Sequence, residues 1–153
     1  MNPIVLDLLT LRQVSGKYYR QLFAPLLARY GLTQMEMDAL LFLANHPQYD
    51  TARDLVAIRQ LTKSHVSLAV DKLTRRGWLA RCPDPDNGRV QHLRILPPAQ
   101  PAVAAGQRLQ TRYAAALMAG IPAPERAAFR CTLQKILANA RQGCTGPEEA
   151  KEK

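Results

Sequence analysis

The densest group of side chains able to bind another molecule lies between residues 62 and 72. The group combines hydroxyl, imidazole and ammonium groups, carried by Thr62, Lys63, Ser64, His65, Ser67 and Lys72. Apolar residues interleave at three- and four-residue steps, which predicts a helix with an apolar inner face and a polar outer face. Hydroxyl and imidazole groups can hydrogen-bond to base edges in the major groove of DNA, and lysines can contact phosphates. The outer face therefore suits recognition of double-stranded DNA.

A second cationic position, Arg89, lies beside a run of turn-forming residues, 83–88. Strand-like residues flank this run, 78–82 before it and 89–96 after it, so the pattern predicts a β-hairpin. A hairpin with a cationic tip can reach phosphates or the minor groove. The order of helix and hairpin predicts a winged helix-turn-helix with Arg89 at the wing.

The elements that must position these residues are mostly helical, because apolar residues recur at helical spacing along the chain. We expect helices over residues 4–30, from Thr33 to about 45, from Thr51 to about 58, from Thr62 to Arg76, from about 98 to 119, and from Pro124 to about 141. Thr33 and Glu36 have the spacing of a capping box, and Thr51 and Thr62 can cap the two helices that follow. Gly31 is a natural end for the first helix.

The basic surplus is spread unevenly along the chain, and the segment with the polar helix and the hairpin carries part of it. The chain has 21 Lys and Arg, 12 Asp and Glu, and a formal net charge of +9. Residues 47–96 have a net charge of +4, residues 97–153 also +4, and residues 1–46 only +1. A basic surplus favours nucleic acid or an anionic membrane surface as partner, and a surface that merely aids solubility is the alternative. No helix combines a large apolar face with a Lys/Arg-rich one, so a membrane partner is not expected.

Other classes of function lack their signatures in this sequence. There is no Gly-rich phosphate loop, nucleophile elbow or zinc motif, so we expect neither an enzyme nor a cofactor. The three histidines lack the spacing of a metal site. Cys82, Cys131 and Cys144 cannot all pair within one chain, which fits a reducing compartment. With neither a signal peptide nor a membrane span, we expect a soluble, cytoplasmic protein.

The order and spacing of several motifs resemble the MarR (multiple antibiotic resistance regulator) family of winged helix-turn-helix transcription regulators. The matching motifs are Gly31-Leu32-Thr33 with Glu36, residues 51–56, residues 61–67 with 70–73, Gly77-Trp78-Leu79, and residues 84–89. The resemblance implies that the first and the last two helices interlock with a second copy. It also implies that the two recognition helices enter adjacent major grooves of a pseudo-palindrome, and that small, often phenolic, molecules weaken DNA binding.

The chain departs from the family pattern at three positions. Leu68 stands where many relatives carry a basic residue, which removes one expected phosphate or base contact. Gly88 stands where a basic wing residue is common, which leaves Arg89 as the main candidate at the tip. Pro97 replaces a usual threonine after the second wing strand.

Each candidate site residue also has a structural interpretation. The serines, lysines and Arg89 could be ordinary solvated surface, whereas Asp71 is expected to pair with an arginine or lysine of the chain because it would repel phosphate. Trp78 is expected in the core. A further group on the first helix could face a cleft for a small aromatic or phenolic effector, or pack at the dimer interface. That group is Tyr18, Tyr19 and Arg20.

The favoured interpretation is a mainly α fold with a small β-hairpin, forming a single MarR-like domain over 1–153. A winged helix-turn-helix at about 33–96 is flanked by dimerisation helices at about 4–30 and 98–141, and 143–153 form a flexible tail. This arrangement predicts a ligand-responsive repressor that binds a pseudo-palindromic operator as a homodimer. The alternative is a winged-helix module for protein–protein contact, which would need neither a cationic wing nor groove-facing donors.

Overall fold

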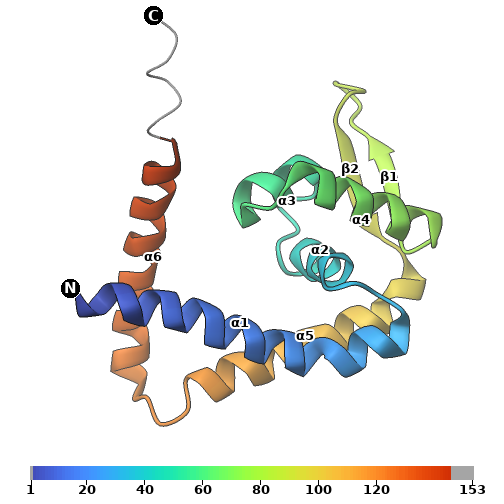
Figure 1. Ribbon diagram of the computed structural model, residues 1–153. Coiled ribbons are helices and arrows are strands. Elements are labelled where there is room, and N and C mark those ends of the chain that lie inside the picture. The colour runs from blue at the N-terminus through green and yellow to red at the C-terminus, as the bar shows by residue number, and fades with distance from the viewer. Residues whose placement is uncertain (1, 146–153) are drawn as a thin grey trace, which may run out of the picture. The chain divides into compact units, whose positions relative to one another are not determined.

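A computed structural model of the chain describes residues 2–145. Within this range the helices are α1 (Pro3–Tyr30), α2 (Gln34–Asn45), α3 (Ala52–Arg59), α4 (Lys63–Arg75), α5 (Gln100–Leu117) and α6 (Ala123–Thr145), with a 3₁₀ turn η1 at Pro97–Ala99 (Figure 1). Two strands, β1 (Leu79–Pro83) and β2 (Gln91–Ile95), form an antiparallel hairpin between α4 and η1. The mainly helical fold with a small hairpin is thus confirmed. The chain divides after Tyr113 into two compact units, which are described separately.

Local capping explains where the first three helices begin and end. Gly31 ends α1 in the left-handed conformation with φ 62°, which glycine adopts without a Cβ penalty. Thr33 accepts a hydrogen bond from the Glu36 N–H at 3.2 Å, and the Glu36 carboxylate accepts one from the Thr33 N–H at 3.2 Å. Thr51 and Asp54 form the same reciprocal box at the start of α3. Both expected caps are confirmed.

The start of α4 differs from its expected capping. Thr62 takes the N-cap position, but its side chain caps no backbone N–H of the described helix. Its carbonyl still accepts the first helical bond, from the Val66 N–H at 3.1 Å. The Thr62 hydroxyl is exposed and is not engaged as a cap. Gly77, with φ 75°, ends the segment as the sequence indicates.

The core of the first unit forms around α2, which is apolar on most of its surface. Its buried side chains meet one face each of α1, α3, α4, the hairpin and the first turns of α5. The largest fully buried side chains of this core are Phe23, Met37, Leu40, Leu41, Leu55, Leu73, Leu79, Val66 and Val70. Trp78 is also buried, as expected. At Gly106 of α5, an added Cβ would meet Leu41 Cδ2 and Met37 Sδ at 3.0 Å. Glycine therefore allows α5 to approach α2 closely.

The two strands differ from their expected bounds: β1 is shifted by one residue from 78–82, and β2 is shorter than the expected 89–96. Leu79 pairs with Ile95 and Pro83 with Gln91, so β1 begins one residue after Trp78 and β2 begins two residues after Arg89. The difference arises because Asn87 and Val90 close a turn, with the Val90 N–H donating to the Asn87 carbonyl at 2.9 Å. An isolated bridge between Thr51 and His92 adds the segment before α3 to the sheet edge.

The second unit consists mainly of α6. This helix continues to Thr145, four residues beyond the expected limit at 141, so the expected tail begins later than residue 143. The rest of that tail, 146–153, lies outside the described residues. Three large apolar side chains of α6 are exposed, namely Phe129, Leu133 and Leu137. Among the described residues, no helix combines the length and apolar character that crossing a membrane requires.

Candidate nucleic-acid interface

The polar residues singled out from the sequence lie on the exposed side of α4 and its N-cap. All six are exposed, and they are Thr62, Lys63, Ser64, His65, Ser67 and Lys72. The opposite side is buried through Val66, Ala69, Val70 and Leu73. The buried side fixes the helix on the core and leaves a mainly polar face, interrupted by Leu68, open to solvent. An open helix face of this kind fits the major groove of DNA in size.

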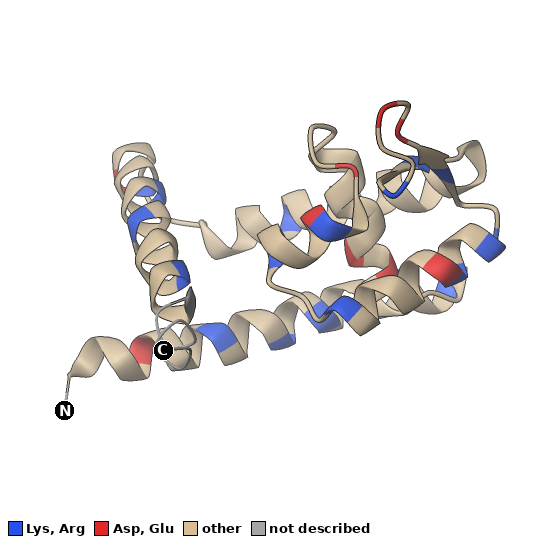
Figure 2. Cartoon of the chain, turned by 90° about the horizontal axis from the view of Figure 1, so that it is seen from above, with Lys and Arg blue, Asp and Glu red and all other residues tan. Residues whose placement is uncertain are grey.

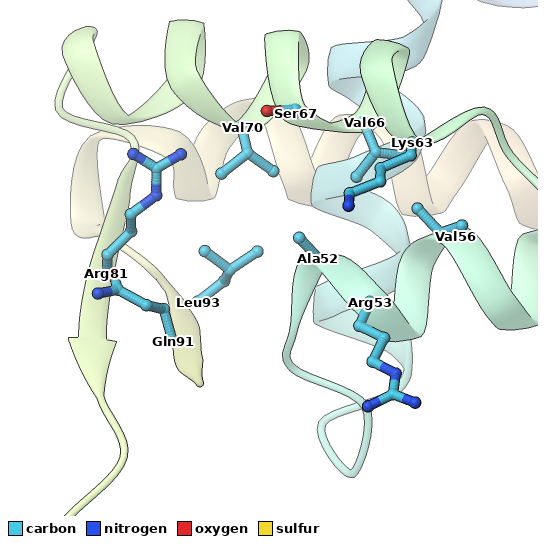
Figure 3. A pocket seen from close by; sticks show the side chains of 10 residues that line it. All are labelled: Ala52, Arg53, Val56, Lys63, Val66, Ser67, Val70, Arg81, Gln91 and Leu93. Carbon is cyan, nitrogen blue, oxygen red and sulfur yellow. The ribbon is translucent and has the colours of Figure 1, made fainter. Parts of the chain in front are cut away.

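A groove of about 420 Å³ separates α4 from α3 and the hairpin (Figure 3). Apolar side chains form one part of its wall, namely Ala52, Val56, Val66, Val70 and Leu93. Polar and cationic side chains form the other, namely Arg53, Lys63, Ser67, Arg81 and Gln91. Lys63 and Ser67 thus lie at the side of α4 that borders α3 and β1, rather than at its outermost line.

A second groove, of about 610 Å³, continues along the inner side of the wing. It brings together Arg53 of α3, Arg81 of β1 and Arg89 of the loop. Sequence reasoning had singled out only Arg89. A usable signal existed for Arg53, because a cation in the first turn of a helix opposes the helix dipole and calls for another role. Three guanidinium groups along one groove suit the phosphates of a nucleic-acid backbone.

Asp71 has a partner within the chain, as the sequence predicted. Its carboxylate forms an ion pair with the Arg81 guanidinium across the gap between α4 and β1. The pair is partly open to solvent, with side chains 44% and 38% exposed. It neutralises the one acidic group on α4 and holds Arg81 against the helix.

Lys72 also has an acidic neighbour, in α2. Its Nζ lies 3.9 Å from the Glu36 Oε1, and the Lys72 side chain is half exposed. Glu36 is itself buried, and its carboxylate accepts the hydrogen bond from the Thr33 N–H in the capping box. The lysine therefore neutralises a buried carboxylate, and its expected phosphate contact stays a prediction.

His92 ties the wing to the segment before α3. Its Nδ1 lies 2.7 Å from Asp50 Oδ1, and its Nε2 lies 2.9 Å from Asp84 Oδ2. Asp84 also accepts hydrogen bonds from the N–H groups of Asp86 and Asn87 at 2.9 and 3.0 Å, which shapes the loop. The bonds to Asp84 and then Asp50 raise the pKa of His92. The bond from His92 and the two backbone donors lower the pKa of Asp84. Protonated His92 can donate to both carboxylates.

Arg89 lies in the loop between β1 and β2, which the bonds of His92 to Asp50 and Asp84 hold in place. The side chain is exposed, and the Arg89 N–H donates to Asn87 Oδ1 at 3.2 Å. Acidic and basic positions both occur in the hairpin and its loop (Figure 2). The loop therefore presents Arg89 on a backbone fixed by hydrogen bonds.

Arg76 has a structural role at the end of α1, whereas the sequence suggested one at the end of its own helix. Its guanidinium donates to the Gly31 carbonyl at 3.3 Å and to the Tyr30 carbonyl, and it lies 4.0 Å from the centre of the Trp78 ring. Cations stabilise the carboxyl end of a helix. In this case the helix is α1 rather than α4 itself, so Arg76 joins the end of α4 to the end of α1.

A separate cleft of about 540 Å³ lies between α1, α2, α3 and α5. Tyr19 and Arg20 line it, whereas Tyr18 does not and instead packs its ring 5.5 Å from that of Tyr113. Cationic side chains also line it, namely Arg12, Arg20 and Arg59. The structure thus brings together two of the three residues considered for an effector cleft.

Polar groups inside this cleft are partly desolvated. Tyr19 donates to Asp38 Oδ1 at 3.5 Å and accepts from Gln110 at 3.3 Å, and Gln34 donates to the same Asp38 oxygen at 3.0 Å. Burial raises the pKa of Asp38 and of Tyr19. Gln34 Oε1 is buried and has no hydrogen-bond partner among the described residues. A free acceptor beside cations and aromatic rings can bind a small polar aromatic molecule.

Metal and thiol chemistry have no assembled site in the described residues. No group of three or more His, Cys, Asp or Glu side chains in this part of the chain could hold a metal ion. Cys82 is half-buried, and Cys131 and Cys144 are exposed, all as free thiols.

Comparisons with known proteins agree with this geometry. The model of the MarR family matches residues 30–90, the region from the end of α1 to the wing. No curated protein is similar to this chain by sequence. Among solved structures, a MarR-family transcriptional regulator from Silicibacter pomeroyi is similar with a TM-score of 0.71 and 26% identity, over 86% of this chain and 86% of that one.

Two further structures share the fold. MepR of S. aureus, in complex with DNA, has a TM-score of 0.73 and 19% identity, over 86% of this chain and 94% of that one. BpsR of Bordetella bronchiseptica, whose DNA binding is regulated by 6-hydroxynicotinic acid, has a TM-score of 0.64 and 20% identity, over 83% of this chain and 90% of that one. The segment from the end of α1 to the wing thus matches the MarR family by sequence, and the fold of the chain is similar to that of a MarR-family transcriptional regulator.

Proposed function

We propose that the protein is a ligand-responsive repressor that binds a pseudo-palindromic operator as a homodimer in the cytoplasm. The observation that carries this proposal is the open polar face of α4 beside a groove lined by Arg53, Arg81 and Arg89. The helix supplies groups that can read base edges, and the groove supplies charges that can hold phosphates. MepR, which shares the fold, is known in complex with DNA.

The two kinds of contact are expected from different elements. Ser64 and Ser67, with Thr62, Lys63 and His65 beside them, meet base edges and nearby phosphates at the start of α4. Arg89 meets phosphate or the minor groove from the wing. Base contacts discriminate between sequences, whereas phosphate contacts strengthen binding to all of them.

Dimerisation is supported by the N-terminal half of α1. Its large apolar side chains are 43–61% exposed, and they are Ile4, Val5, Leu6, Leu8, Leu9, Leu11 and Val14. Contiguous apolar surface on a soluble protein marks an interaction site. A second copy, interlocking through α1, α5 and α6, would bury it and set two α4 helices one helical turn of DNA apart.

The cleft at Tyr19 is the proposed effector site. Arg12, Arg20 and Arg59 suit a carboxylate, and the rings of Tyr19 and Tyr113 suit an aromatic body. The cleft lies between the α1–α5 frame and α2–α3, so a ligand there can shift the recognition helix. BpsR, with the same fold, responds to an aromatic acid. Aromatic acids titrated into a protein–DNA complex test this part, and an Arg20→Ala variant should need a higher concentration for release.

The experiment that tests DNA reading compares a duplex selected by the protein from a random pool with a scrambled duplex. Arg89→Ala should weaken binding to both and lower the salt slope by about one for each protomer. Ser64→Ala or Ser67→Ala should narrow the affinity gap between the duplexes by about 1–3 kcal/mol for each lost base contact. Lys17→Ala, which removes an exposed cation of α1, is the matched control.

Three results would count against the proposal. An Arg89→Ala protein with the wild-type salt slope would contradict the wing contact. An unchanged gap in both serine variants would contradict base reading by this part of α4. A protein that binds both duplexes equally, or neither, would favour the protein–protein module instead.

A further inference from the structure

The buried side of α4 defines which of its residues point furthest from the core. The helix advances by one turn every 3.6 residues, and Val66, Ala69, Val70 and Leu73 mark its inner line. The line opposite to it consists of Ser64, Leu68, Asp71 and Arg75. Ser67 lies to one side of this line, facing the groove toward β1. If α4 enters a groove of DNA, the outer line makes the closest approach to the bases.

Leu68 is the apolar member of that outer line. Its side chain is 51% exposed, between the exposed Ser64 and the half-buried Asp71. An exposed leucine alone is ordinary. What distinguishes Leu68 is its place on the outermost line of the helix that carries the candidate base contacts, where a polar side chain would be free to hydrogen-bond.

The neighbours of Leu68 constrain what it can face. Asp71, one turn further along, is held by the Arg81 guanidinium at the side of α4. Ser64, one turn earlier, is free to bond a base. In a complex with DNA, Leu68 would therefore approach the floor of the major groove between Ser64, which can hydrogen-bond, and the ion pair of Asp71 with Arg81. Leucine itself has no side-chain donor or acceptor.

The chemistry of the major groove leaves one good partner for such a side chain. Every base edge there carries a hydrogen-bond donor or acceptor, and thymine alone adds an apolar C5-methyl group. Leucine against a guanine, cytosine or adenine edge would strip water from polar groups without replacing their hydrogen bonds, which is unfavourable. Leucine against thymine buries the methyl group and gains apolar contact.

We propose that Leu68 contacts the C5-methyl group of a thymine in each half-site and makes it a determinant of operator recognition. This inference rests on the proposed DNA-binding function. The preference concerns the methyl group itself, so it separates thymine from uracil, which pairs identically with adenine.

The test uses the full chain and the duplex that it selects from a random pool. Each thymine of the half-site is replaced in turn by uracil, which removes only the methyl group. For the wild type, one such replacement should lower affinity about fourfold per half-site, the value of burying one methyl-sized group. In Leu68→Ala the same replacement should change affinity little, because the covering side chain is gone.

Two controls make the outcome specific. Ser64→Ala should lose discrimination elsewhere but keep the fourfold response to the methyl group. Leu68→Ala should keep the wild-type unfolding midpoint, because the residue is exposed and alanine favours the helix. The coupling between variant and replacement, read as a double-mutant cycle, isolates the contact.

The possible failures are distinguishable. If wild type and Leu68→Ala respond equally to every uracil, or if no uracil matters to the wild type, Leu68 reads no thymine, while the proposed DNA binding stands. If the protein selects no duplex from the pool, the proposed function fails and this inference fails with it.

Discussion

Replacing Arg81 by alanine should damage DNA binding much more than folding. Arg81 lines both grooves beside α4, and its guanidinium neutralises Asp71 on the outer line of the helix. The variant therefore has two effects at once. It removes a cation that faces the DNA, and it leaves an unpaired carboxylate on the helix that approaches the bases.

The sizes of these effects follow from the geometry. Loss of one phosphate contact should lower the salt slope by about 0.9 for each protomer. If the unpaired Asp71 carboxylate comes within about 8 Å of a phosphate in water, it adds repulsion of about 0.5 kcal/mol, or about twofold in affinity. The free energy of unfolding should change by at most about 1 kcal/mol, because both side chains of the Asp71–Arg81 pair are more than a third exposed.

A double-mutant cycle separates the two effects. Salt-titrated binding and urea unfolding are measured for Arg81→Ala, Asp71→Asn and the combined variant, with Lys17→Ala as control. The combined variant should bind DNA more tightly than Arg81→Ala while keeping its reduced salt slope. The reasoning is refuted if Arg81→Ala has the wild-type salt slope, or if adding Asp71→Asn to Arg81→Ala restores no affinity for DNA.

Three further predictions concern the hairpin, the core and the dimer. His92→Gln should lower the free energy of unfolding most between pH 3.8 and 6.5. Because folding raises the pKa of His92, its contribution to stability is complete below pH 6.5 and is lost as pH rises through the pKa of His92 in the folded protein. Because folding lowers the pKa of Asp84, its contribution is lost as pH falls through the pKa of Asp84 in the folded protein. Unfolding followed across pH checks this, and a difference that is the same at all pH values would contradict it. Gly106→Val should destabilise the fold by about 1–3 kcal/mol, because even a Cβ would meet Leu41 at 3.0 Å; an unchanged urea midpoint would show that α5 does not need the close approach. Wild-type protein at micromolar concentration should sediment as a dimer and Leu8→Lys with Leu11→Lys as a monomer, whereas a monomeric wild type would argue against the homodimer.

Local signals in the sequence were sufficient for most helix ends and for the exposed polar face of α4. The capping boxes at Thr33 and Thr51 and the glycines at 31 and 77 act through residues at most four positions away, so their patterns are legible in one sequence. The inner face of α4 follows from helical spacing alone. Thr62 shows the limit of this reasoning, because a residue type that can cap does not always do so.

Contacts between distant parts of the chain could not be predicted in the same way. His92 meets Asp50 across 42 positions, and Arg76 meets Tyr30 across 46. No local pattern marks such pairs. The same limit applies to Tyr18 and Tyr19. Both rings lie beside that of Tyr113, but only Tyr19 lines the cleft, since successive helical residues are about 100° apart. Arg53, Arg81 and Arg89 line one groove because the hairpin packs beside α3, and no local pattern indicates that packing.

The central claim is that this chain reads a DNA sequence, and its affinity ratio for a selected duplex over a scrambled one tests that claim most directly. The measurement is a pair of binding isotherms at the same near-physiological salt concentration. A protein that combines phosphate contacts with base contacts from α4 should bind the selected duplex at least about 10³-fold more tightly. A ratio near one would contradict the account, because a basic surface alone binds all DNA alike.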